Sequence, residues 1–345
     1  MADSKTIAID AMGGDHGPES TIPGAALCLK DHPKLKFMIY GDEARINPLL
    51  NKHPDLKKVS IVHHTEKQIR SDEKPSAALR ASKGSSMRMA IEAVQEGHAD
   101  AIVSAGNTGA LMALAKMVLK SSADIRRPAI ASIFPTLRGR AIMLDLGANV
   151  LVDAENLVQF AVLGSVFAKV HFDVAVPTVG LLNVGSEEMK GPDHVRAAAA
   201  ILSEVDFPGH YSGFVEGDDI TKGTVDVIVS DGYAGNIALK TAEGVGSLTG
   251  KMFKKYMTSD PLAILGSLLA FFALKRFKNY VDPRRYNGGV FLGLNGLCVK
   301  SHGGCDAVAF SSAMKLAANL AEHAYIETVA RDINHLMEQE ESFLS

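Results

Sequence analysis

The stretch TIAIDAMGGDHGP, residues 6–18, decides the fold class. A short apolar run ends in Asp10 and passes directly into a loop that contains three glycines. The run is typical of a buried strand, and the loop is typical of the tight turn that follows one. Similar runs alternate with helical patterns along most of the chain, which predicts an α/β protein built on a mainly parallel sheet.

The same patterns predict the individual elements. Strands are expected at residues 6–10, 36–40, 59–63, 99–105, 129–134, 140–146, 178–184 and 225–230. The firmest helices are expected at residues 85–96, 110–120, 154–168, 193–204, 234–255 and 306–330. Since no repeat, low-complexity tract or long linker interrupts this order, one domain covering residues 1–345 is predicted.

Residues 251–280, KMFKKYMTSDPLAILGSLLAFFALKRFKNY, depart from the α/β rhythm. Two apolar helical stretches are separated there by Ser259, Asp260 and Pro261. Proline is well suited to the first turn of a helix, and Ser259 or Asp260 can cap that turn. The segment therefore predicts a helical hairpin that projects from the domain.

Composition narrows the class of protein. The chain has 345 residues, 47% of them hydrophobic, with 36 basic and 39 acidic side chains, so its near-neutral charge makes nucleic acid an unexpected partner. Its three cysteines form no close pair and residues 1–10 lack a signal-peptide pattern, which indicates a reduced, cytoplasmic protein. The longest apolar stretch, residues 261–274, is shorter than the roughly 20 residues that span a bilayer.

Six apolar runs lead into small, polar, glycine-bearing loops. These loops begin after Asp10, Ala105, Asp145, Val184, Ser230 and Ser301. Glycine lets a ligand approach the backbone, and each helix that follows directs its positive dipole end toward the loop. We expect all six loops to share one edge of the sheet, where they would bind an anion such as phosphate.

Several sharper motifs are absent from the sequence. It contains no G-x-x-x-x-G-K-[ST], G-x-S-x-G, H-E-x-x-H or C-x-x-C, and no full G-x-G-x-x-G follows the first predicted strand. Their absence argues against four classes of protein: P-loop nucleotide-binding proteins, serine hydrolases, zinc enzymes and proteins with a standard dinucleotide site. No cofactor and no metal are expected, and a structural role is expected for Asp15, Asp145 and Asp231.

The loops also carry a resemblance. DAMGGDHGP at 10–18, SAGNTGALMA at 104–113 and LDLGAN at 144–149 resemble the bacterial phosphate acyltransferases. The similarity continues, in order, through NVGSEEMKG at 183–191, FVEGDDI at 214–220, SDGYAGNIALKTAEG at 230–244 and LGLNGLCVKSHGGCDA at 292–307. It covers nearly the whole chain.

The resemblance implies a three-layer α/β/α fold related to isocitrate and isopropylmalate dehydrogenases and to phosphotransacetylases. It implies a homodimer that transfers a fatty acyl group from acyl-acyl carrier protein to inorganic phosphate, for phospholipid synthesis. It also implies a cytoplasmic enzyme that associates peripherally with the membrane. A membrane-bound glycerol-3-phosphate acyltransferase would then take up the acyl phosphate.

Under this reading, phosphate attacks the thioester directly and no enzyme nucleophile is required. The enzyme must supply an anion cage and donors to the oxyanion, worth roughly 3 to 4 kcal/mol per donor. The expected phosphate-binding residues are Gly106, Asn107, Thr108 and Gly109, helped by Lys190 and Lys300. Asn149, Asn183, Asn236 and Ser301 are candidates to orient the thioester, and His16 and His302 are candidates to move protons.

The hairpin supplies two further candidate surfaces. Its basic residues are expected to dock the acidic carrier protein, unless they are merely solvated. They are Lys254, Lys255, Lys275, Arg276, Lys278, Arg284 and Arg285. Its apolar residues Leu265, Leu268, Leu269, Phe271 and Phe272 are expected to rest on the membrane, with burial in a helical dimer interface as the competing interpretation.

Three alternative functions stay open at this point. A phosphotransacetylase-like transferase would use coenzyme A esters, but it would have no obvious use for the hairpin. A decarboxylating dehydrogenase of related fold would need NAD and magnesium. A noncatalytic lipid-binding or carrier-protein-binding module would not need so many polar glycine loops.

Overall fold

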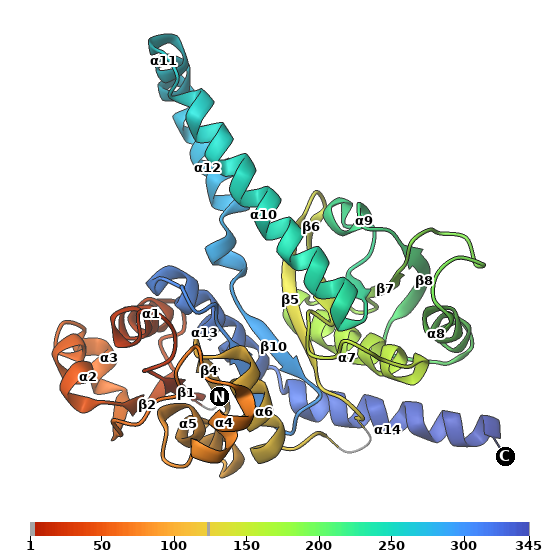
Figure 1. Ribbon diagram of the computed structural model, residues 1–345, viewed down its shortest axis with the longest axis horizontal. Helices are drawn as coiled ribbons and strands as arrows, with labels where there is room; N and C mark the ends of the chain where they lie inside the picture. Colours follow the sequence, from red (N-terminus) through yellow and green to blue (C-terminus); the bar gives the residue numbers. More distant parts are fainter. Residues whose placement is uncertain (1–3, 123–124, 345) are drawn as a thin grey trace.

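The computed structural model describes residues 4–122 and 125–344, and Figure 1 shows their arrangement. These residues build one sheet of eleven strands in the order β3-β2-β1-β4-β11-β10-β5-β6-β9-β7-β8. The strands are β1 (Thr6–Asp10), β2 (Lys36–Gly41), β3 (Ser60–His64), β4 (Ala101–Ser104), β5 (Ala129–Thr136), β6 (Gly139–Leu144), β7 (Thr178–Leu182), β8 (His210–Val215), β9 (Val227–Val229), β10 (Gly289–Leu292) and β11 (Leu297–Lys300).

Helices connect these strands. They are α1 (Pro18–Asp31), α2 (Glu43–Leu50), α3 (Pro54–Lys58), α4 (Pro75–Ala81), α5 (Ser86–Gln95), α6 (Thr108–Val118), α7 (Ala154–Phe172), α8 (Asp193–Glu204), α9 (Asp219–Lys222), α10 (Gly232–Met257), α11 (Pro261–Leu269), α12 (Phe271–Val281), η1 (Pro283–Tyr286), α13 (Ala307–Glu322) and α14 (Tyr325–Leu344).

Alternate side chains along each strand face opposite sides of the sheet, and helices pack on both sides. In β1, Ile7 and Ile9 pack in one core with residues of α1, α7, α13 and α14. Ala8, between them, faces the opposite core, which contains residues of α5 and α6. Successive strand side chains point to opposite faces, so helices cover both faces of the sheet. The predicted α/β class with a mainly parallel sheet is confirmed.

The strand directions divide the sheet into two blocks. The strands β3, β2, β1, β4 and β11 are parallel to one another, as are β6, β9, β7 and β8. Between the blocks, β10 is antiparallel to β11 and β5, and β5 is antiparallel to β6. Three antiparallel pairings in succession reverse the direction of the second block relative to the first.

This reversal corrects the expectation that all six glycine loops share one edge. The loops after β1, β4 and β11 leave the sheet together and form what we call the first loop group. The loops after β6, β7 and β9 leave strands that run the opposite way and form the second loop group. The cause is the inserted antiparallel pair of β10 and β5, of which β10 was not predicted.

Two other expectations differ from the structure. The helix predicted at 306–330 is broken into α13 and α14, because Ala324 adopts a left-handed conformation with φ 51°. The edge strand β8 was missed, since its sequence HYSGFV is mostly half-buried or exposed and carries no continuous apolar run. The remaining predicted elements agree with the structure to within a few residues.

The helices α10, α11 and α12 form an arm that projects from the body (Figure 1). The break between α10 and α11 lies where it was predicted, and Asp260 caps α11 by accepting hydrogen bonds from the backbone N–H groups of Leu262 and Ala263. Neither α11 nor α12 contains a buried residue. Within the described residues, no helix combines the length and the apolar character needed to cross a membrane.

Candidate active site

The first loop group surrounds a pocket of about 310 Å³. Its lining residues are Gly14, Asp15, Ser71, Ala105, Gly106, Asn107, Thr108, Gly109, Lys300 and Gly303. Five residues expected to bind phosphate therefore lie together at this pocket. The sixth, Lys190, belongs to the second loop group and is not among the lining residues.

Close backbone packing holds the three loops of the first group together. Gly14 has φ +87°, and a Cβ atom there would lie 2.7 Å from the carbonyl oxygen of Gly303. The backbone N–H of Asp15 donates to the same oxygen at 2.9 Å, and the N–H of Ser301 donates to the oxygen of Ser104 at 2.8 Å. A larger residue than glycine at position 14 would separate the loops.

The start of α6 forms one wall of the pocket. Asn107 caps this helix by accepting a hydrogen bond from Ala110 N–H at 3.0 Å. Its side-chain nitrogen donates to the carbonyl oxygens of Ser71 and Glu73, at 2.8 and 3.0 Å. The Asn107 side chain is thus occupied by hydrogen bonds to the protein. What the start of α6 offers an anion is its backbone N–H groups and its dipole.

A buried carboxylate that sequence reasoning did not select supports this wall. Asp10 accepts hydrogen bonds from the hydroxyls of Ser86 and Ser104, both at 2.6 Å, and Ser104 Oγ in turn accepts one from Gly106 N–H at 3.0 Å. Burial raises the pKa of Asp10. The signal available in the sequence was a charged residue at the end of an apolar strand, where burial requires partners.

Within the part of the chain that the structure describes, Lys300 is the one cationic side chain that lines the pocket. Its ammonium contacts the carbonyl oxygen of Ser301 and donates to that of Ala105 at 3.4 Å. Burial lowers its pKa to about 8, an effect that the nearby groups of Cys305 and Asp10 oppose. Lys300 is therefore still mostly protonated at neutral pH, when it can pair with a phosphate oxygen.

The two histidines and Ser301 lie around the pocket rather than in its lining. His302 is exposed, and its Nδ1 accepts a hydrogen bond from Gly304 N–H at 3.2 Å. His16 is also exposed, just before the start of α1. Ser301 is fully buried, and its hydroxyl accepts a hydrogen bond from Asn287 at 2.7 Å. Of these three, only the histidines present a side chain to solvent.

In the second loop group, two of the predicted asparagines brace the protein itself. The Asn149 side chain donates to the carbonyl oxygen of Pro128 at 2.8 Å and to Asp145 at 2.9 Å. The Asn183 side chain donates to the oxygens of Gly185 and Lys190, at 3.2 and 3.0 Å. Both residues are buried, so these side chains shape the loops.

The other two predicted residues of this group are open to solvent. Lys190 is exposed and forms an ion pair with Glu187 at 2.6 Å. Asn236 is exposed in the first turns of α10, against Gly147. A surface ion pair of this kind is weak and exchangeable. Among the residues predicted in this loop group, Lys190 and Asn236 are therefore the ones with exposed side chains.

Asp145 organises the loop after β6. Its carboxylate accepts hydrogen bonds from the backbone N–H groups of Ile130, Gly147, Ala148 and Asn149, at 2.7 to 3.3 Å. Burial raises its pKa, and the hydrogen bonds oppose that rise. We expect Asp145→Ala to lower the free energy of unfolding by about 3 kcal/mol, because it leaves several buried donors unpaired.

Chemical denaturation measures this loss. The matched control is Asp153→Ala, which removes an aspartate that caps α7 and should cost about 1 kcal/mol. Equal losses in the two variants would show that Asp145 is no more than a helix-cap aspartate in energetic terms.

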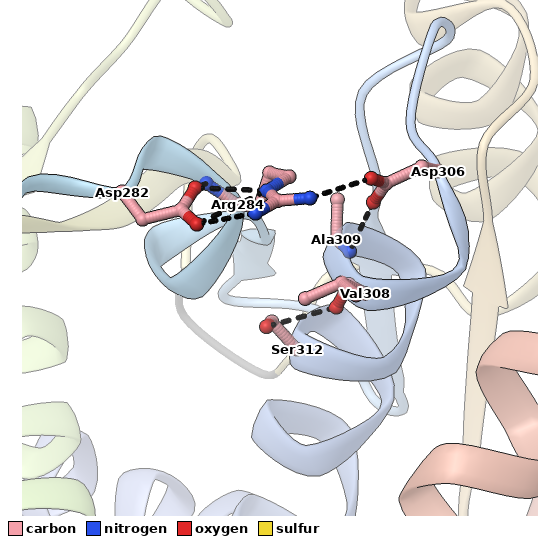
Figure 2. Close-up of polar contacts among 6 residues, drawn as sticks. All are labelled: Asp282, Arg284, Asp306, Val308, Ala309 and Ser312. Carbon is pink, nitrogen blue, oxygen red and sulfur yellow. Dashed lines mark hydrogen bonds and ion pairs between the residues drawn. The ribbon is translucent and has the colours of Figure 1, made fainter. Parts of the chain in front are cut away.

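The basic residues selected for docking are exposed along the arm and at its exit. Arg284 differs from the others because its guanidinium lies between Asp282 and Asp306, as Figure 2 shows. The shortest contacts are 2.7 Å to Asp282 and 3.0 Å to Asp306. Arg284 thus links the exit of the arm to the residue that caps α13.

The apolar residues selected for membrane contact are also exposed. Leu268 and Leu269 are 70% and 81% exposed, and Leu265, Phe271 and Phe272 are at least half exposed. An exposed cluster of this size usually marks an interface with a protein or a membrane.

Known proteins resemble this chain in both sequence and structure. A family model described as "Fatty acid synthesis protein" matches residues 5–328. The phosphate acyltransferase of Rhodospirillum centenum is 53% identical over 97% of this chain and 95% of that protein. That of Caulobacter vibrioides is 51% identical over 97% of this chain and 93% of that protein.

Among solved structures, a phosphotransacetylase from Streptococcus pyogenes superposes with a TM-score of 0.62 at 17% identity, covering 92% of this chain and 94% of that one. A 4-hydroxythreonine-4-phosphate dehydrogenase from Klebsiella pneumoniae gives 0.52 at 15% identity, covering 93% and 99%. These two likenesses establish the fold alone. The sequence identities over nearly the full length establish more: the chain is an acyltransferase and belongs to the phosphate acyltransferase family.

Proposed function

We propose that this acyltransferase moves a fatty acyl group from acyl-acyl carrier protein to inorganic phosphate, as a step in phospholipid synthesis. The observation that carries the proposal is the pocket of the first loop group. It combines a half-buried lysine, the start of α6 and glycine-rich backbone, which together suit a small multiply charged anion.

The chemistry needs little else from the protein. A phosphate oxygen attacks the thioester carbonyl, the carbon–oxygen bond forms, and the carbon–sulfur bond breaks as the carrier thiolate leaves. Lys300 and the N–H groups at the start of α6 hold the phosphate in place. His16 and His302, exposed in loops of the first group, would receive protons.

A direct assay tests the proposal and separates it from the coenzyme A alternative. The purified protein is mixed with phosphate and either palmitoyl-acyl carrier protein or palmitoyl-coenzyme A, and acyl phosphate and free thiol are measured. We expect product from the carrier-protein substrate, with a much lower kcat/KM for the coenzyme A ester. Preference for coenzyme A would replace the proposed substrate, and product from neither would refute the proposal.

We also propose that the enzyme is a cytoplasmic homodimer associated peripherally with the membrane. Exposed apolar residues recur at helical spacing along α10, which suits pairing with a second copy. They are Ile237, Val245, Leu248, Met252 and Tyr256. The apolar end of the arm would then meet the membrane, where a glycerol-3-phosphate acyltransferase would take up the product.

The basic residues of the arm are proposed to dock the acidic carrier protein. Reversing two of them, Lys275→Glu with Lys278→Glu, should raise KM for acyl-acyl carrier protein about tenfold at low salt and weaken its salt dependence. The KM for phosphate should not change. Steady-state kinetics over a range of salt concentrations measures both quantities.

The matched control is Lys52→Glu with Lys57→Glu, which reverses one exposed charge between α2 and α3 and one in α3. If this control raises KM as much as the arm variant does, net charge rather than a docking surface explains the effect.

A further inference from the structure

Asn287 lies where the exit of the arm enters the sheet, between η1 and β10. Its side chain is half-buried and makes three hydrogen bonds. The amide nitrogen donates to Ser301 Oγ at 2.7 Å and to the carbonyl oxygen of Ala309 at 2.8 Å. The amide oxygen accepts from the backbone N–H of His302 at 3.0 Å. One side chain therefore fixes two consecutive residues of the loop after β11.

Two lining residues of the pocket adjoin these contacts, Lys300 at the end of β11 and Gly303 in the loop that follows. Lys300 contacts the carbonyl oxygen of Ser301, so its ammonium depends on the path of the chain at that residue. The oxygen of Gly303 accepts the N–H of Asp15, which joins this loop to the loop after β1. The contacts that Asn287 makes are thus directly beside those that place the lysine and close the pocket.

The segment that carries Asn287 is itself anchored. Arg284, three residues earlier, is held between Asp282 and Asp306 (Figure 2). Asp306 also caps α13 by accepting the N–H of Ala309, the residue whose carbonyl oxygen Asn287 contacts. Both Arg284 and Asn287 therefore hold the segment against the start of α13. Because the backbone around Asn287 is anchored in this way, its side chain can hold the loop after β11 in a defined position.

We propose that Asn287 is a positioning residue for phosphate: it holds the loop after β11 so that Lys300 and Gly303 face the pocket. The inference rests on the proposed function for its kinetic consequence, because the pocket must bind phosphate for turnover. Asn287 does not line the pocket, so it acts through the loop. Its loss should weaken phosphate binding more than it slows the reaction of bound substrates.

Two variants test this role. Asn287→Ala removes all three hydrogen bonds, and Asn287→Asp keeps the size of the side chain and the acceptor for His302 but removes both donors. We expect each to raise the dissociation constant and the KM for phosphate about tenfold, with kcat reduced less than threefold. Calorimetric titration with inorganic phosphate alone measures the first, and steady-state kinetics measures the others.

The control is Asn295→Ala, in the turn between β10 and β11, at the other end of the same two strands. Asn295 also donates its side-chain amide to a backbone carbonyl, that of Ser121 at 2.9 Å, but it is remote from the pocket. This variant should bind phosphate as the unaltered protein does. Thermal unfolding of all three variants shows whether an effect on binding merely follows a loss of stability.

The outcomes separate this inference from the proposed function. If the unaltered protein binds phosphate but makes no acyl phosphate, the proposed function fails, and the titrations still decide the role of Asn287. Unchanged phosphate affinity in the Asn287 variants overturns the inference, whatever their thermal stability. It is also overturned if neither variant folds, if kcat alone falls, or if Asn295→Ala weakens binding equally.

Discussion

Replacing Lys300 with methionine is expected to lower kcat/KM for phosphate at least a hundredfold at pH 7. Methionine fills a similar volume but removes the only cationic side chain among the described residues that line the pocket. A charge-assisted hydrogen bond to phosphate is roughly twice as strong as a neutral one, and a hundredfold loss corresponds to about 2.7 kcal/mol. Steady-state kinetics with phosphate as the varied substrate measures the change.

The pH dependence gives a sharper form of this result. The pKa of Lys300 is about 8, so the side chain loses its proton as the pH rises above that value. For the free enzyme, kcat/KM for phosphate should therefore fall above about pH 8. Lys300→Met should lack this fall, because no ammonium remains to be deprotonated.

As the pH rises above 8, the free energy of unfolding should increase while kcat/KM falls. The folded-state pKa of Lys300 lies below its ordinary value of 10.5, so the unfolded chain holds the proton more tightly than the folded protein between about pH 8 and 10.5. Burial of the ammonium thus costs stability below pH 8, and the cost is relieved as the pH rises through this window. Lys300→Met should be at least as stable as the unaltered protein at pH 7.

Lys116→Met is the matched control, because Lys116 is exposed near the far end of α6, the helix whose start forms a wall of the pocket. It should leave kcat/KM and its pH profile unchanged. A Lys300→Met variant that unfolds early, with activity lost in proportion, would make Lys300 a structural residue. Retained activity would remove it from the phosphate site.

The second large effect concerns the apolar end of the arm. Leu268→Glu and Phe271→Glu should each abolish flotation with anionic liposomes, because a carboxylate is placed where an apolar side chain would enter the interface. Both side chains are at least half exposed, at 70% and 51%. The variants should remain as stable as the unaltered protein, since the arm helices α11 and α12 bury no residue within the described chain.

Oligomeric state must be measured alongside flotation, because the same side chains could be covered in a dimer. The control is Val176→Glu, at an exposed apolar residue in the loop before β7. Variants that stay dimeric but no longer float, beside a control that floats normally, support membrane contact. Variants that float as before, or dissociate into monomers, remove the support for it.

The glycine loops illustrate what local sequence could reveal about the site. The residues Gly106 to Gly109 and Lys300 were selected because a polar glycine turn follows a strand, and the structure brings them to one pocket. The glycine turns themselves are local features, and they meet at one pocket because β1, β4 and β11 are parallel neighbours in the sheet. The helix break at Asp260 could also be predicted from local sequence, because proline and a capping aspartate act within one turn.

The division into two loop groups was decided only by the tertiary structure. A strand's sequence shows its burial but not its direction relative to a neighbour, and β10 pairs with β5 across more than 150 residues. Asp10 was likewise not predictable as a support of the site, since its serine partners lie 76 and 94 residues away in the chain. The partners of Asn287 and Arg284 are nearer, but apart from Asp282 they lie beyond β10 and β11, so the fold of these strands decides the contacts. The sequence by itself determined the α/β class, the break that opens the arm and the glycine loops that follow the strands, whose causes act over a few residues. Strand direction and the hydrogen bonds that hold the loops in place depend on contacts between distant segments, which only the folded chain brings together.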